Sequence, residues 1–263
     1  MPYVDLATGA RLEYVDTALE DSARPVVIAV HGLLGTARRH LGRVIDWLAA
    51  DYRVLGPSMR GYGGSRPKPR DFPPDFYRRD AGDLLAFMDA LGIAQAHLLG
   101  YSDGGEIALL AAGLAPERFR SVVAWGAVGY FGPQLREVIT APGYRERLAP
   151  TPTQMTLHGI PDRDAFAQGW IDAVLHMIDV GDGDVSLSTA DRIAAPLLMM
   201  LGREDRLNPA EYAEHYLERA GHGRLILFDC GHPVHDQQPE EFRQLVGSFL
   251  AHVEAGDART YGY

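Results

Sequence analysis

The stretch "AHLLGYSDGGEIALLAAGLA", residues 96–115, runs from an apolar segment into a helical pattern through a serine that lies between glycines. Its centre, Gly100 to Gly104, fits the pattern G-x-S-x-G, in which a tight strand-to-helix turn raises the serine to the carboxyl edge of a sheet. Such a turn leaves no room for bulk two residues before and after Ser102, which explains the two glycines. The bare pattern also arises by chance, and the alternative is a glycine-rich turn with a solvated serine. With a strand before it and a helix after it, the stretch predicts a nucleophile elbow at Ser102.

Short unbroken apolar runs recur along the chain, each bounded by glycine, proline or charge. Runs of this length are typical of strands that are buried on both faces of a parallel sheet. They are "VVIAV" (26–30), "AHLLG" (96–100), "SVVAW" (121–125), "LLMML" (197–201) and "LILF" (225–228). Amphipathic helical patterns lie between them, as in "DFYRRDAGDLLAFMDAL". This alternation predicts an α/β fold with a doubly wound, mostly parallel sheet. The first sixteen residues resemble a hairpin at the sheet edge, with its turn at Thr8-Gly9.

One region interrupts the alternation of strands and helices. Residues 130–192 contain no clear buried strand, and five prolines separate short amphipathic pieces such as "DAFAQGWIDAVLHMI". We interpret 130–192 as a helical lid inserted into a core made of residues 1–129 and 193–263. The alternative is a pair of ordinary crossover helices with long loops, but about sixty residues is far above the usual length of a connection.

Composition limits the class of protein. The chain has 263 residues, 46% of them hydrophobic, which suffices for one large domain with a buried core. Its net charge of −10 argues against a nucleic-acid partner. No segment resembles a signal peptide, and no apolar run approaches the roughly 20 residues that cross a bilayer. The single cysteine, Cys230, forms no internal disulfide, so we expect a cytoplasmic protein with no membrane partner.

A nucleophilic serine needs a base and a group that orients the base. Asp205 follows the run 197–201 by four residues, and His232 follows the run 225–228 by four. The order Ser, Asp, His is the one used by folds with this elbow, and both residues lie at strand ends. Glu204 is the most credible substitute for Asp205, and His235 is expected at the lid side or the surface.

An oxyanion hole needs two backbone N–H donors near the serine. We expect one from Asp103, directly after the serine, and one from Leu33 in the loop that follows "VVIAVHG". The chemistry requires no metal and no organic cofactor. The glycine-rich segment "RGYGGS" (60–65) lacks the spacing of a dinucleotide site, and "DVGDGD" (179–184) does not match a calcium loop.

Together, "HGLLG", "RGYGGS", "GYSDGG", "GREDRLNP" and "CGHPVH" resemble the α/β-hydrolase family over nearly the whole chain. Longer runs, among them "GYSDGGEIALLAA" and "VVAWGAVGY", are similar to the biphenyl hydrolase-like branch of that family. The resemblance implies Ser102, Asp205 and His232 as the catalytic triad. It also implies that Asp103 holds the α-ammonium group of an amino-acid ester.

Two observations limit this resemblance, one for the family and one for the narrower branch. Many relatives carry an aspartate before "RGYG", where this chain has Pro57-Ser58-Met59. We therefore expect Arg60 to lack an ion-pair partner. The loop "HGLLG" is the commoner family form and does not itself support the narrower branch.

Asp103 places a carboxylate next to the serine that must develop a negative oxyanion. Two unit charges about 6 Å apart repel by roughly 3 kcal/mol at an effective dielectric constant near 20. That repulsion is comparable to the contribution of one oxyanion donor, about 3–4 kcal/mol. A substrate with its own cation beside the ester carbonyl removes the repulsion. The alternative is that Asp103 caps the helix that begins there.

The function that we expect is hydrolysis of carboxylic esters, above all α-amino-acid esters, through an acyl-enzyme on Ser102. The substrate is thus a small ester that carries an α-ammonium group. Rival interpretations are a general carboxylesterase or lactonase, a carbon–carbon bond hydrolase of the same fold, and a ligand-binding receptor with low turnover. The sequence does not indicate the oligomeric state.

Overall fold

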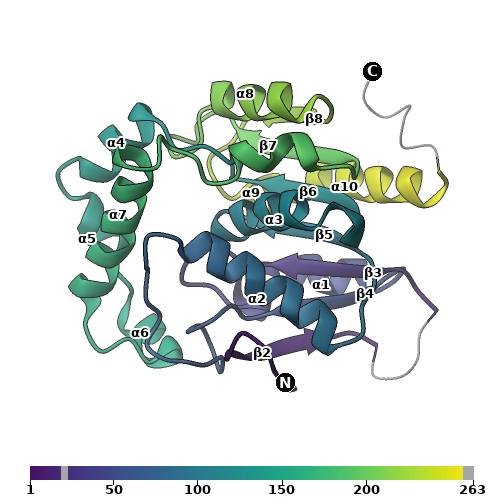
Figure 1. The fold of residues 1–263 in the computed structure, drawn as a ribbon, viewed down its shortest axis with the longest axis horizontal. Helices are drawn as coiled ribbons and strands as arrows, with labels where there is room; N and C mark the ends of the chain where they lie inside the picture. Colours follow the sequence, from purple (N-terminus) through teal and green to yellow (C-terminus); the bar gives the residue numbers. More distant parts are fainter. Residues whose placement is uncertain (19–22, 257–263) are drawn as a thin grey trace.

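The computed structural model describes residues 1–18 and 23–256, and in this part of the chain eight strands form one sheet (Figure 1). The strands are β1 (Tyr3–Asp5), β2 (Arg11–Asp16), β3 (Val26–Val30), β4 (Arg53–Pro57), β5 (Ala96–Tyr101), β6 (Phe119–Trp125), β7 (Leu197–Gly202) and β8 (Arg224–Phe228). Their spatial order is β1-β2-β4-β3-β5-β6-β7-β8. All neighbours from β4 to β8 pair in parallel, and β1 and β2 add an antiparallel edge.

The sheet confirms the predicted fold class. Each of the five apolar runs lies in a strand, and β1 and β2 form the predicted hairpin, whose turn includes Gly9 at φ +81°. Strand β4 was not predicted. Its apolar segment consists of little more than Val54 and Leu55, too short a run to be recognised by pattern. Both residues are fully buried because β4 lies inside the sheet, between β2 and β3.

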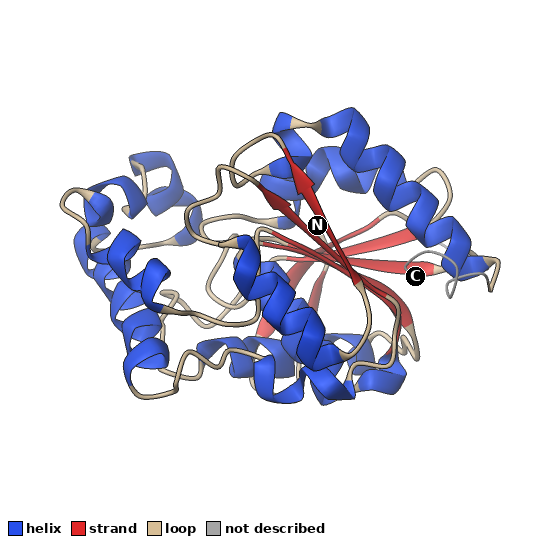
Figure 2. Ribbon diagram, turned by 90° about the horizontal axis from the view of Figure 1, so that it is seen from above, coloured by secondary structure: helices blue, strands red, loops and turns tan. Residues whose placement is uncertain are grey.

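Helices cover both faces of the sheet (Figure 2). The helices of the core are α1 (Ala37–Leu48), α2 (Phe76–Ala90), α3 (Asp103–Leu114), α8 (Ala210–Ala220), α9 (Val234–Gln237) and α10 (Pro239–Glu254). Two short 3-10 helices are η1 (Pro116–Arg118) and η2 (Leu187–Arg192). Buried side chains of α1 and α10 pack in one hydrophobic cluster, and those of α2, α3 and α8 pack in another. The core is therefore three-layered, as a doubly wound sheet requires. Among the described residues, no helix is long and apolar enough to cross a membrane.

The segment that we predicted as a lid is helical. It contains α4 (Pro133–Thr140), α5 (Tyr144–Leu148), α6 (Pro152–His158) and α7 (Arg163–Asp179). These helices gather on one side of the molecule, beyond the carboxyl ends of the parallel strands (Figure 1). A β-bridge between Tyr130 and Asp184 joins the two ends of the segment. The division of the chain into a core and a lid at 130 and 192 stays a prediction.

Candidate active site

Ser102 occupies the sharp turn between β5 and α3. Its backbone has φ 56° and ψ −124°, a region that a residue with a side chain rarely adopts. The glycines of the motif permit this turn by close contact. A Cβ at Gly100 would collide with the carbonyl of Gly104, and one at Gly104 would collide with the carbonyl of Val30. The elbow is thus wedged between its own helix and β3, which keeps the strained serine in place.

The structure brings Ser102, His232 and Asp205 into one hydrogen-bonded line. His232 Nδ1 lies 2.7 Å from Asp205 Oδ2, and His232 Nε2 lies 2.9 Å from Ser102 Oγ. Because a carboxylate only accepts, Nδ1 carries the proton of the neutral ring and Nε2 is free to accept from the serine hydroxyl. This arrangement can remove the serine proton as the oxygen attacks a carbonyl.

Asp205 is fixed by its own loop. Its Oδ1 accepts from the backbone N–H of Leu207 at 3.0 Å, and its Oδ2 accepts from Asn208 Nδ2 at 2.9 Å. The carboxylate is almost completely buried. The competing carboxylate of Glu204 is exposed to solvent, whereas the hydrogen bond to His232 comes from Asp205. Of the two candidates, the structure therefore joins Asp205 to the histidine.

The expectation that His235 lies at the lid side or the surface is wrong. Its side chain is 3% exposed, and its Nδ1 accepts from the indole Nε1 of Trp125 at 2.9 Å. The short helix α9 begins at Val234 and turns His235 back toward the sheet. Burial lowers the pKa of His235, and nearby His232 lowers it further.

The loop after β3 lies directly over the serine. A Cβ at Gly32 would come within 2.9 Å of Ser102 Cβ, so the backbone of this loop touches the predicted nucleophile. His31 Nδ1 donates to the Gly32 carbonyl at 2.8 Å, and its Nε2 accepts from the Met59 N–H at 2.9 Å. Burial lowers the pKa of His31 to about 3, which keeps the ring neutral. The Gly32 carbonyl belongs to the same peptide as the Leu33 N–H, the predicted oxyanion donor, so His31 orients that peptide.

Asp103 lines the same cavity as Ser102 and His232. Its side chain makes no capping hydrogen bond to α3. Oδ1 accepts from the Tyr77 hydroxyl at 2.8 Å, and Oδ2 is buried with no hydrogen-bond partner among the described residues. Burial raises the pKa of Asp103 to about 6, although the bond from Tyr77 acts in the opposite direction. The carboxylate is therefore held by one donor and half unsatisfied.

A buried arginine lies near Asp103 but is paired elsewhere. Arg70 places Nη2 2.6 Å from Asp80 Oδ2, and both side chains are almost fully buried. Its guanidinium lies against the rings of Tyr62, Phe72 and Phe76. At long range this charge lowers the pKa of Asp103, yet no described lysine, arginine or histidine forms an ion pair with Asp103.

Several wall residues of the cavity escaped the sequence analysis, among them Tyr77, Glu106 and Trp170. Glu106 lies one turn after Ser102 on α3, a spacing that could have revealed it. Its two carboxylate oxygens accept from the N–H groups of Val128 and Gly129 at 2.8 and 2.9 Å. Burial raises the pKa of Glu106 to about 8. The indole Nε1 of Trp170, from α7, forms no hydrogen bond of good geometry in the described structure, yet the Trp170 side chain is close enough to lower the pKa of Asp103. The lid therefore contributes one wall of the cavity.

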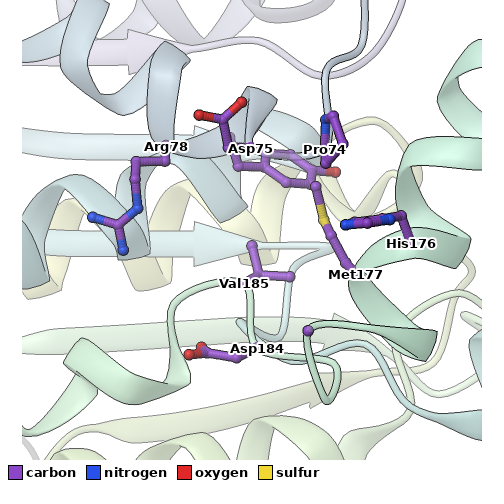
Figure 3. Close-up of a pocket in the computed structure, with 9 residues that line it drawn as sticks. Pro74, Asp75, Arg78, His176, Met177, Asp184 and Val185 are labelled. Carbon is purple, nitrogen blue, oxygen red and sulfur yellow. The ribbon is translucent and has the colours of Figure 1, made fainter.

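A second cavity, of about 280 Å³, shares one lining residue, Tyr77, with the cavity of Ser102. Arg78 borders it from α2, Asp75 from the position just before α2, and Asp184 from the segment after α7 (Figure 3). None of the predicted catalytic residues lines this second cavity. The predicted reacting groups belong to the cavity of Ser102, and Tyr77 lines both cavities.

The expectation that Arg60 lacks an ion-pair partner is wrong. Arg60 Nε and Nη2 each lie 2.7 Å from an oxygen of Asp83, a bidentate pair. Asp83 lies on α2, far along the chain from the position where relatives carry their aspartate. The carboxylate therefore reaches Arg60 from a different element.

The fold and this arrangement define the class of protein. The family model of the alpha/beta hydrolase fold matches residues 25–142. The chain is 32% identical over 254 residues to Serine hydrolase BPHL from Homo sapiens, which covers 92% of this chain and 84% of the relative. The chain belongs to the α/β-hydrolase family, and it is a serine hydrolase similar to the biphenyl hydrolase-like proteins.

The chain is also similar to hydrolases with other names. The chain is 31% identical to the 2-hydroxymuconate semialdehyde hydrolase of Pseudomonas putida, over 77% of this chain and 78% of that one. The crystal structure of the enol-lactonase from Burkholderia xenovorans LB400 superimposes with a TM-score of 0.72. The match covers 95% of this chain and 100% of the lactonase chain. At 22% identity it shows a shared fold alone.

Proposed function

We propose that this serine hydrolase cleaves α-amino-acid esters through an acyl-enzyme on Ser102. The observation that carries the proposal is the buried, unpaired Oδ2 of Asp103 in the cavity of the predicted nucleophile. A buried acceptor without a partner costs about 1–3 kcal/mol, and more when it is charged. A ligand that brings a cation to this point satisfies the acceptor and neutralises the charge.

The proposed mechanism starts with proton transfer. His232, held by Asp205, takes the proton of Ser102 as the serine oxygen attacks the ester carbonyl. The oxyanion rests on the backbone N–H groups of Leu33 and Asp103, and the alcohol leaves with a proton from His232. Water then attacks the acyl-enzyme by the same route and releases the amino acid.

The proximity of Asp103 to Ser102 makes the α position the favoured place for the cation. The ammonium of an α-amino ester lies on the carbon next to the carbonyl, and Asp103 is the residue next to the serine. An ion pair here both offsets the repulsion between the oxyanion and the carboxylate and orients the carbonyl for attack. The proposed ion pair binds only the acyl part of the ester. We therefore expect the enzyme to be selective for the acyl group and to accept many different alcohol groups.

The test compares each amino-acid ester with its desamino analogue. We expect Asp103→Asn to lower kcat/KM for valine and phenylalanine esters by about 10- to 100-fold, the worth of one charged hydrogen bond. The matching isovalerate and hydrocinnamate esters, which lack the ammonium, should change by less than about threefold. Ser102→Ala should abolish the burst of product from an activated ester in all cases.

Equal losses on charged and uncharged esters would mean that Asp103 has a structural role. A wild-type enzyme that prefers uncharged esters or lactones would be a general esterase, and one that prefers dienol ketones would be a carbon–carbon bond hydrolase. The 2-hydroxymuconate semialdehyde hydrolase relative makes the last of these alternatives worth including in the same assay.

A further inference from the structure

The loop over the nucleophile contains a strained residue. We call residues 32–35 the oxyanion loop. Its turn is closed by the Gly35 N–H, which donates to the Gly32 carbonyl at 3.1 Å, and Leu34 in the turn has φ +59°. This left-handed conformation is uncommon for leucine and persists only where the surroundings hold the backbone.

The group that holds Leu34 comes from the lid. His158, the last residue of α6, places Nε2 3.0 Å from the Leu34 carbonyl oxygen. Its Nδ1 accepts from the backbone N–H of Gly63 at 3.0 Å. A carbonyl only accepts and an amide N–H only donates, so the ring is neutral with its proton on Nε2. The side chain is completely buried.

Two histidines thus hold two peptides of the oxyanion loop, Gly32–Leu33 and Leu34–Gly35. His31, from the core, donates to the Gly32 carbonyl, and His158, from the lid, donates to the Leu34 carbonyl. The ring of Tyr62 packs edge-on against both, with centroid distances of 5.3 and 5.2 Å. The segment "RGYGGS" therefore contacts both histidines, through the ring of Tyr62 and the backbone N–H of Gly63.

We propose that His158 is a positioning residue, through which the docked lid completes the oxyanion hole by fixing the direction of the Leu33 N–H. The inference rests on the proposed role of that N–H as an oxyanion donor. Release of the Leu34 carbonyl frees the Leu34–Gly35 peptide to rotate, and the Gly35 N–H of that peptide then leaves the Gly32 carbonyl. Because the Gly32 carbonyl shares a peptide with the Leu33 N–H, this donor then changes direction. The bound ester is little affected, whereas the tetrahedral intermediate depends on that donor.

The surroundings of His158 keep it in the neutral form that these bonds require. Burial above all, with the charges of Lys68 and Arg39, lowers the pKa of His158 to about 4, although the hydrogen bond to the Leu34 carbonyl acts in the opposite direction. A second proton on the ring would face the N–H of Gly63. The ring therefore remains both donor and acceptor at neutral pH.

The test uses His158→Phe, His158→Gln and a matched control, Lys68→Met. Lys68 Nζ donates to the Leu157 carbonyl at 3.3 Å, so its loss loosens the same helix without touching the oxyanion loop. Each variant is assayed for kcat/KM on p-nitrophenyl acetate, for affinity to phenylboronic acid, whose tetrahedral adduct places an oxygen in the hole, and for thermal unfolding.

We expect His158→Phe to lower kcat/KM by about 10- to 100-fold and to weaken boronic acid binding in parallel, since a misplaced oxyanion donor costs up to that much. His158→Gln should recover part of the loss, because an amide can donate and accept. Lys68→Met should change neither quantity by more than about threefold. A purely structural role would instead make the losses follow the unfolding temperature in all three variants.

A folded His158→Phe with unchanged kcat/KM, or with lost activity but unchanged boronic acid affinity, overturns the proposal. If His158→Phe does not fold, His158→Asn takes its place, since its shorter amide cannot reach both partners, and unchanged kcat/KM there has the same meaning. The acetate ester has no ammonium, so a failure of the proposed amino-acid selectivity leaves this result standing. Absence of Ser102-dependent turnover in the wild type would refute the proposed function and this inference together.

Discussion

The Tyr77 hydroxyl donates a 2.8 Å hydrogen bond to Asp103 Oδ1, while Asp103 Oδ2 has no partner among the described residues. Tyr77 comes from α2 and Asp103 from the start of α3, so the packing of two helices decides which oxygen is satisfied. A half-satisfied carboxylate in a buried cavity is costly for the fold and well suited to binding a cation. The first three predictions follow from this pair.

The selectivity for charged substrates should depend on pH through Asp103. We expect the ratio of kcat/KM for valine esters to that for isovalerate esters to rise with pH, with a midpoint at about 6, where Asp103 loses its proton. Taking the ratio cancels the titration of the groups that both reactions share. The ratio should fall again as the substrate ammonium deprotonates, near the α-amino value of about 7.7. In Asp103→Asn the ratio should be flat near pH 6, and a midpoint at that pH in this variant would contradict the assignment.

Tyr77→Phe should shift that midpoint to higher pH. The tyrosine bond stabilises the ionised carboxylate and lowers the pKa of Asp103, so its removal raises the pKa. At neutral pH we expect the preference for valine esters to drop by about 3- to 10-fold, the worth of one hydrogen bond. Tyr216→Phe is the matched control, since Tyr216 is a fully buried tyrosine of α8 whose hydroxyl bonds to Ser186. An equal drop in both variants would indicate a general packing effect.

Asp103→Asn should make the protein more stable above about pH 6. The pKa of Asp103 is about 6 in the folded state, against an ordinary value of 3.8 for the unfolded chain. Between these values the folded state binds more protons, so the free energy of unfolding falls as pH rises and remains lower above pH 6. Neutral asparagine lacks this penalty, and we expect a gain of about 1–3 kcal/mol at high pH.

Chemical denaturation at about pH 8 and pH 4 checks this stability prediction. The gain should largely disappear at the lower pH, where the folded state keeps the aspartate protonated. A variant that is less stable than the wild type at both pH values would show that the carboxylate is structurally required.

Gly104→Ala should disrupt the elbow, and Gly82→Ala should not. A Cβ at Gly104 would collide with the backbone of Val30, which cannot move without disturbing β3. We expect a loss of about 1–3 kcal/mol in unfolding free energy and of most activity. Gly82, inside α2, has open space around its Cβ position, so alanine there should stabilise the helix by about 0.5–1 kcal/mol. Similar unfolding temperatures for the two variants would contradict the close contact.

Prediction from the sequence succeeded where the signal was local and failed where a side chain meets a distant element. The five apolar runs form strands, as their short length and the breakers at their ends indicate. His235 was placed wrongly, because its contact with Trp125 depends on how α9 folds back against β6. The pairing of Arg60 with Asp83 escaped for the same reason, since the carboxylate comes from another element.

The sequence by itself determined the fold class, the strand-to-helix turn around Ser102 and the chain order of Ser102, Asp205 and His232. Each of these is written in residues that are neighbours in the chain or recur at a fixed period. Only the tertiary structure decided that Asp103 Oδ2 is left without a partner among the described residues and that His158 of the lid holds the Leu34 carbonyl. Burial and hydrogen-bond satisfaction are properties of packing, and packing joins residues whose separation along the chain carries no signal.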